Sequence, residues 1–93
     1  MTHKKATVPL TYDIDSKHVA FKKALKKLGY ADYFVGRQRN NLPNTTMCHA
    51  HKTAEEARDE AKTLSDQLSV KLERCFAIEF SSWSAIAGAA HAE

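Results

Sequence analysis

The chain of 93 residues has little glycine, proline or cysteine, and each shortage excludes a class of protein. Its three glycines are scattered, so no glycine-rich phosphate-binding loop is present, and the G-x-S-x-G motif of serine hydrolases is missing as well. The two cysteines are isolated, which excludes a disulfide framework and the paired C-x-x-C motifs of a zinc ribbon. No apolar run is long enough to span a membrane, and no secretory signal is recognisable. We therefore expect a cytoplasmic protein without membrane association.

The composition is that of an ordinary globular protein. Hydrophobic residues make up 43% of the chain and charged residues 27%, which is far from the charge-rich composition of disordered segments. A chain of this length is too short to bury two separate cores, so we expect residues 1–93 to form one domain. Its core is expected over 6–80, whereas the tail over 81–93 stays ambiguous between a strand, a helical turn and a frayed end. The formal charge of +3 permits an anionic partner without requiring one.

The first third of the chain predicts a strand followed by a helix. Apolar residues alternate over 6–14, which predicts a strand. Its inward face would consist of Val8, Leu10, Tyr12 and Ile14. A helix is expected over 17–28, with Asp15 or Ser16 as its N-cap and Gly29 in a left-handed C-cap conformation. The apolar stripe of this helix would consist of Val19, Phe21, Ala24, Leu25 and Leu28.

The rest of the chain predicts a hairpin, a second helix and a last strand. Strands are expected over 31–35 and 45–50, joined by a polar loop over 36–44. Thr53 and Glu56 form a capping box, which marks the start of the second helix. The apolar stripe of this helix would consist of Ala54, Ala57, Ala61, Leu64 and Leu68. The last strand is expected over 72–80, with its inward side chains being Phe76, Ile78 and Phe80.

The resulting element order, βαββαβ, is that of an α+β ferredoxin-like fold. Such a fold has a four-stranded antiparallel sheet with two helices on one face and the strand order 4-1-3-2. In this order the first strand separates Cys48 from Cys75 by two strand spacings, roughly 9.5 Å. A disulfide needs less than about 7 Å between the α-carbons, so two free thiols are expected.

Asp13 is the candidate catalytic and metal-binding residue. It lies with Asp15 near the C-terminal end of the first strand and would point to the face without helices. A carboxylate there could bind a divalent cation such as Mg²⁺ or Mn²⁺, and two copies brought together in a dimer would do so better than one. The alternative is that Asp15 caps the first helix and Asp13 is a solvated turn residue.

Two basic segments are candidates for nucleic-acid binding. Five lysines fall along the expected outer side of the first helix, and Lys22 and Lys26 are representative of them. Arg37 and Arg39 lie in the polar loop, directly after the aromatic pair Tyr33 and Phe34. Arginine binds phosphate and aromatic rings stack on bases, so single-stranded nucleic acid suits this loop. The alternatives are a solvated helix face for the lysines and a core position for the aromatic pair.

A third cluster, Cys48, His49 and His51, contains residue types that bind soft or borderline metals. Neighbouring residues of a strand point to opposite faces, so Cys48 and His49 could not easily reach one ion, while His49 and His51 could share a face. The ordinary alternative is a half-buried cysteine beside surface histidines.

Short motifs spread over most of residues 6–80 resemble known small proteins of this fold. The first strand ends in Tyr-Asp-Ile-Asp and is followed by a lysine-rich helix ending in Leu-Gly-Tyr, which resembles the small CRISPR-associated ferredoxin-like endoribonuclease and adaptation subunit. Residues 42–46, 57–59 and 76–78 are similar to uncharacterised SinR-like proteins of the same fold. The resemblance implies a homodimer that acts on or scaffolds RNA or DNA, and it matches Asp13 to the metal-binding aspartate of the CRISPR-associated family.

Three functional hypotheses follow from these features. The leading one is a small dimeric nucleic-acid-associated protein in which catalysis is not required. The second is an endonuclease that depends on Mg²⁺ or Mn²⁺ and uses Asp13. The third is a protein-interaction module that binds a partner through the open sheet face or through the region of Trp83 and Ile86.

Overall fold

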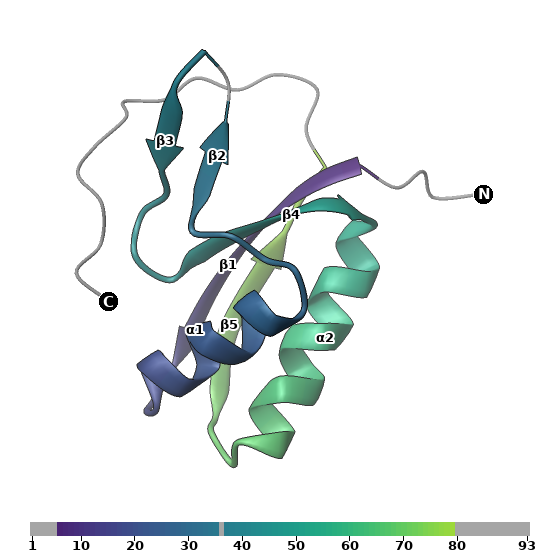
Figure 1. The fold of residues 1–93 in the computed structure, drawn as a ribbon. Coiled ribbons are helices and arrows are strands. Elements are labelled where there is room, and N and C mark those ends of the chain that lie inside the picture. The colour runs from purple at the N-terminus through teal and green to yellow at the C-terminus, as the bar shows by residue number, and fades with distance from the viewer. Residues whose placement is uncertain (1–5, 36, 80–93) are drawn as a thin grey trace.

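The computed structural model describes residues 6–35 and 37–79, which form an α+β fold with two helices and five strands. Figure 1 shows the helices packed against a sheet and a small hairpin beside it. In chain order the elements are β1 (Ala6–Ile14), α1 (His18–Lys27), β2 (Tyr33–Val35), β3 (Arg39–Asn41), β4 (Thr46–Lys52), α2 (Ala54–Gln67) and β5 (Leu72–Ala77). Neither described helix is long and apolar enough to cross a lipid bilayer. The tail expected over 81–93, with Trp83 and Ile86, lies outside the described residues.

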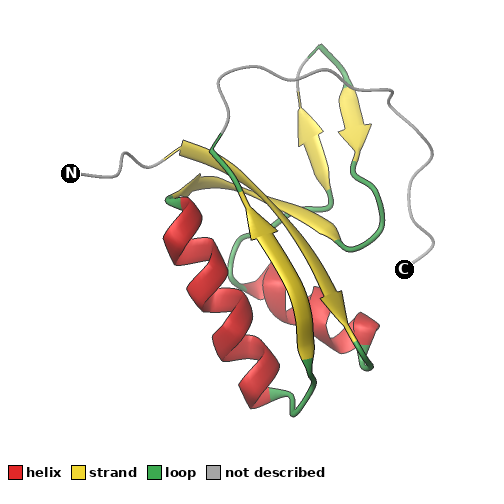
Figure 2. Ribbon diagram, turned by 180° about the vertical axis from the view of Figure 1, so that it is seen from behind, coloured by secondary structure: helices red, strands yellow, loops and turns green. Residues whose placement is uncertain are grey.

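The main sheet has three antiparallel strands in the order β4-β1-β5, and both helices cover one face of it, as Figure 2 shows from the opposite side. The expected four-stranded sheet is therefore only partly formed. The segment that should supply the fourth strand makes a single bridge to β4, in which Ala31 and Cys48 exchange two hydrogen bonds of 2.9 Å. The chain then leaves the sheet, and β2 pairs with β3 in a separate hairpin.

The strand β3 lies inside the segment that the sequence predicts as a polar loop. Asn40 is the reason, because its side chain is buried in the hairpin and donates to the carbonyl oxygens of Phe34 and Gln38 at 3.3 and 3.0 Å. These bonds satisfy the amide group and hold the two short strands together. The loop of the prediction is thus a hairpin with its own internal order.

The core lies between the sheet and the helices, and β1 supplies its centre. The alternation expected for β1 is confirmed, since its four apolar side chains are at most 5% exposed. Tyr12 packs against Phe21 of α1, with ring centroids 4.8 Å apart. The expected stripe of α1 is wrong at both ends, because Val19 is 50% exposed and Leu28 is 40% exposed. The helix contacts the sheet mainly through Phe21 and Leu25.

The inward face of β5 is the opposite of the expected one. Phe76 is 67% exposed and Ile78 is 40% exposed, whereas Cys75 and Ala77 pack against the core; Phe80 lies outside the described residues. The reason is the pairing with β1, in which Cys75 lies opposite the buried Tyr12. Residues directly opposite in an antiparallel pair point to the same face. Small side chains fit there because α2 presents alanines to the sheet and approaches it closely.

The N-termini of the two helices behave differently. The capping box of α2 is confirmed: the Thr53 hydroxyl accepts from the Glu56 amide at 3.1 Å, and the Thr53 amide donates to the Glu56 carboxylate at 3.0 Å. The cap expected for α1 is wrong, because Lys17 is the N-cap residue and no side chain caps the helix. Asp15 instead accepts a hydrogen bond from the Lys71 amide at 2.9 Å, which ties the end of β1 to the start of β5.

Both helices end in the same hydrogen-bonding pattern. After α1, the expected left-handed glycine is confirmed: Gly29 has a φ of 96°, and the next residue, Tyr30, is buried and donates to Leu25 O at 3.1 Å. After α2, Ser69 takes the equivalent position with a φ of 56°, followed by the buried Val70. Each end is a Schellman motif with its hydrophobic contact.

The two motifs give a matched pair of stability predictions. We expect Ser69→Gly to raise the free energy of unfolding by about 0.5–1 kcal/mol, because glycine adopts a left-handed conformation without a Cβ penalty. Gly29→Ala should lower it by about 1–3 kcal/mol, since the new Cβ would also lie 2.9 Å from His49 Nε2. Urea denaturation measures both. A loss of stability in Ser69→Gly would contradict the equivalence of the two helix ends.

Candidate functional site

The face of the sheet that carries no helix presents a mixed apolar and polar surface. On this face Thr11 of β1 lies between Phe76 of β5 and Thr46 of β4. The hydroxyl oxygens of Thr11 and Thr46 are 3.3 Å apart, within hydrogen-bond distance. Phe76 has 67% of its surface exposed, the largest exposed fraction among the large hydrophobic residues of the described chain. We call this surface the open face.

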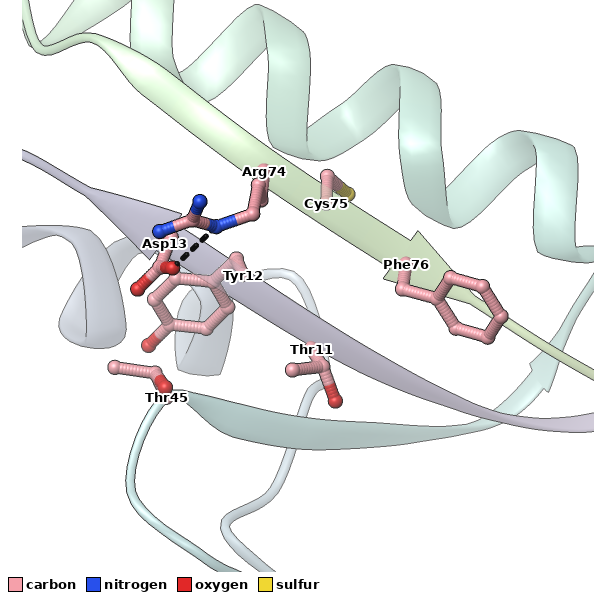
Figure 3. Close-up of a pocket in the computed structure, with 7 residues that line it drawn as sticks. All are labelled: Thr11, Tyr12, Asp13, Thr45, Arg74, Cys75 and Phe76. Carbon is pink, nitrogen blue, oxygen red and sulfur yellow. Dashed lines mark hydrogen bonds and ion pairs between the residues drawn. The ribbon is translucent and has the colours of Figure 1, made fainter.

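A shallow depression of about 570 Å³ lies in the open face (Figure 3). Figure 3 shows Asp13 and Arg74 side by side at one end of it, Phe76 at the other end and Thr11 between them. The depression therefore combines a charged end, a hydroxyl group and an aromatic ring. These are the three kinds of side chain that contact phosphate, sugar and base in single-stranded nucleic acids.

Asp13 and Arg74 form an ion pair across β1 and β5, with 2.8 Å between Arg74 Nε and Asp13 Oδ2. Their backbones are directly opposite in the register, so the two side chains point to the same face of the sheet and can reach each other. The hydrogen bond and the negative charge of Asp13 raise the pKa of Arg74, which is charged at every physiological pH. Because the bond uses Nε, the terminal amino groups of the guanidinium retain hydrogen atoms for another acceptor.

Asp13 points to the open face, as expected, but its surroundings do not suit Mg²⁺ or Mn²⁺. Its carboxylate accepts a hydrogen bond from Arg74, and a cation would have to compete with that guanidinium. Within residues 6–35 and 37–79, no three or more histidine, cysteine or acidic side chains are grouped where they could bind one ion. The nearby Asp15 is engaged by the Lys71 amide. The catalytic and metal-binding roles of Asp13 stay predictions from the sequence.

The cluster of Cys48, His49 and His51 is dispersed. Cys48 lies opposite Pro9 and His49 opposite Val8, so their side chains point to different faces of the sheet. His49 Nδ1 already accepts from the His51 amide at 3.0 Å, and burial lowers the pKa of His49. Burial also raises the pKa of the Cys48 thiol to about 11. As expected, both cysteines are free thiols.

The lysines of α1 do not all lie on its outer side. The Lys22 side chain is only 8% exposed, and its ammonium group lies 3.3 Å from Asp32 Oδ2. Lys26, which is 43% exposed, lies 3.6 Å from the same oxygen. Burial alone would raise the pKa of Asp32, but the hydrogen bond from Lys22 and the charge of Lys26 outweigh it and hold that pKa below its ordinary value. Lys22 and Asp32 thus fix α1 to the start of the hairpin.

The two arginines of the hairpin are exposed, as a binding role requires. The Arg39 guanidinium lies 3.9 Å from the centre of the Tyr33 ring, which pairs it with an exposed aromatic side chain. Arg37 lies at the exposed turn between β2 and β3. Lys22, by contrast, is buried in an ion pair with Asp32, so it is not exposed as the two arginines are.

Sequence reasoning missed Arg74 and Phe76 as site residues because it assigned Phe76 to the core. The signal that could have found them is the small size of Cys75 and Ala77, which suits packing against the alanine stripe of α2. No family model, curated protein or solved structure matches this chain. The resemblances noted above therefore stay expectations, and the function has to be argued from the open face itself.

The ion pair of Lys22 with Asp32 predicts a specific pH dependence of stability. A carboxyl group with a lowered folded-state pKa stabilises the protein above its unfolded pKa of about 3.9, and this contribution is lost as the pH falls through the folded value. Asp32→Asn should therefore lower the free energy of unfolding by about 1–3 kcal/mol at pH 6, because it removes a carboxylate charge that lies beside the buried Lys22 ammonium group.

Urea denaturation at pH 6 and below pH 4 measures this dependence. The difference between wild type and Asp32→Asn should shrink at the lower pH, whereas Asp59→Asn, on the exposed face of α2, should stay within about 0.5 kcal/mol of wild type. A deficit of Asp32→Asn that is equal at both pH values would show that the carboxylate charge is not what stabilises the contact.

Proposed function

We propose that this protein binds single-stranded nucleic acid on the open face of the sheet. The observation that carries the proposal is that the exposed Phe76 ring and the Arg74 guanidinium lie on the same face of one strand. An exposed aromatic ring on a sheet without covering helices is a platform on which a base can stack, and every base has a face that can do so. This ligand class is the one that the sequence also favours, and Arg74 and Phe76 join Arg37 and Arg39 as the residues that support it.

The charges around the platform favour a polyanion. Arg74 can donate to a phosphate with its terminal amino groups while Asp13 orients it through Nε. At the other edge of the sheet the hairpin stands next to β4, and it carries Arg37 and Arg39 with the ring of Tyr33. A strand of nucleic acid that crosses the sheet from β5 towards β4 would meet cationic and aromatic groups at both ends. The formal charge of +3 has the sign that such a ligand needs.

The lysines of α1 contribute little to the proposed binding surface. Lys22 is buried against Asp32 and serves the fold, whereas the exposed Lys26 can add only long-range attraction from the helix side. Binding should therefore depend on β5 and the hairpin and much less on α1. This dependence separates the open face from the lysine-rich helix as the binding surface.

Fluorescence anisotropy with labelled single-stranded RNA and DNA at low salt tests the proposal. Phe76→Ala should weaken binding by about 5- to 150-fold, because stacking contributes about 1–3 kcal/mol per base. Val19→Ala, which shortens an exposed apolar side chain on α1, is the matched control and should bind as wild type does. Absence of binding at low salt, or equal loss in both variants, would exclude the open face.

Charge variants give a second, independent test. Arg74→Ala should weaken binding and reduce its salt dependence, whereas Arg58→Ala, which removes an equally charged exposed residue of α2, should change it much less. Asp13→Asn should strengthen binding several-fold at low salt, because it removes a negative charge from the ligand's path and releases Arg74.

The same Asp13 variant separates binding from cleavage. If the protein were the Mg²⁺- or Mn²⁺-dependent endonuclease considered from the sequence, Asp13→Asn would abolish cleavage of RNA or DNA in the presence of those ions. A binding protein should bind equally well in EDTA and leave the strand intact. Metal-dependent cleavage that disappears in Asp13→Asn would show that the protein is a nuclease and would contradict a role in binding alone.

A further inference from the structure

The strand β5 is an edge strand of the main sheet, and no described strand pairs with its outer edge. The direction of its backbone groups follows from β1. The amide of Tyr12 donates to Thr45 on the β4 side at 3.1 Å, so its neighbours Thr11 and Asp13 direct their N–H and C=O groups towards β5. Phe76 and Arg74, which lie opposite them, use their backbone groups in this ladder.

The residues between these pairs face the other way. Cys75 and Ala77 lie opposite Tyr12 and Leu10 in non-hydrogen-bonded pairs, so their N–H and C=O groups point to the outer edge of the sheet. A hollow of about 420 Å³ follows this edge, between Cys75 and Ala77 on one side and the first turns of α2 at Ala54 and Arg58 on the other. An extended segment can therefore approach the edge from the solvent.

We propose that this edge pairs with the β5 edge of a second copy of the chain, antiparallel and with Cys75 on the two-fold axis. The charges of β5 select this register. Centring the axis on Arg74 or on Glu73 would place like charges directly opposite each other, which is unfavourable. Centring it on Phe76 would leave only three residues of each strand paired, since β5 ends at Ala77.

The register centred on Cys75 makes two favourable contacts and uses the outward backbone groups. Cys75 and the partner's Cys75 form a hydrogen-bonded pair, with α-carbons about 5.5 Å apart. Arg74 lies opposite the partner's Phe76 on the open face, at an α-carbon distance of about 4.5 Å, where a guanidinium can contact an aromatic ring. Two such contacts form, one on each side of the axis. The two sheets then become one six-stranded sheet with both open faces on the same side.

The two cysteines of the chain make this interface directly testable on the unmodified protein. Dibromobimane bridges thiols that are only a few ångströms apart, and it should yield a covalent dimer from the wild type and from Cys48→Ala. Cys75→Ala should give no covalent dimer and yet sediment as a dimer in analytical ultracentrifugation. The measurement is made without nucleic acid, so its failure and the failure of the proposed function are distinguishable.

A proline variant tests the role of the backbone edge. Ala77→Pro removes one outward N–H and leaves the ladder to β1 intact, so it should raise the dimer dissociation constant about tenfold or more. Ala77→Val adds a side chain of about the size of proline but keeps the N–H group, so this variant should dimerise as wild type does. Circular dichroism establishes that both variants fold. A monomer at every concentration, or a dimer that cannot be cross-linked through Cys75, would overturn the proposal.

Discussion

The register between β1 and β5 is the constraint on which the rest of the molecule depends. The alternation of β1 is strong, because its four apolar residues must be buried, and each residue of β5 takes the face of its partner on β1. A slip by one residue would turn Phe76 and Arg74 into the core and expose Cys75 and Ala77. Such a slip would bury the charge of Arg74 away from Asp13, which is strongly unfavourable. The ion pair on the open face therefore helps to specify the register.

The helix layer agrees with this choice of face. The side of α2 that contacts the sheet is lined by Ala57 and Ala61, both fully buried, and the strand beneath it presents Cys75 and Ala77. Small residues on both sides let the helix approach closely, and a phenylalanine at either strand position would push it away. The exposed aromatic ring and the close helix packing are thus two results of one arrangement.

The elements that sequence reasoning predicted well are those specified by local signals. The apolar residues of β1 alternate strictly with polar ones or proline, the start of α2 has a capping box, and Gly29 suits its left-handed position because it has no Cβ atom. The segment of β5 has apolar residues at both even and odd positions, and their larger size wrongly predicts Phe76 and Ile78 as the inward pair. Only the pairing with β1 decides which of these residues face the core, and β1 is distant from β5 in the sequence.

The other errors also arise from distant contacts. Lys22 follows Phe21 in a helix rich in lysine, and its burial depends on Asp32, which lies beyond the helix end. Likewise, the polar residues of β3 have low strand propensity, and the buried Asn40 side chain stabilises the hairpin by adding hydrogen bonds to the carbonyl oxygens of Phe34 and Gln38. In both cases a polar group is buried with its partner, so hydrophobic patterns alone place it on the surface. The open face itself was expected, but not which side chains of β5 lie on it.

The two proposals use different atoms of the same short strand. The side chains of Arg74 and Phe76 form the open face, whereas the backbone groups of Cys75 and Ala77 form the edge. Because successive residues of a strand turn in opposite directions, six residues can serve a ligand on the face and a second chain at the edge without competition for hydrogen bonds. Pairing would in addition bring the partner's Arg74 beside each Phe76 ring. It would add a second positive charge next to the ring, which attracts the phosphate groups of a nucleic acid.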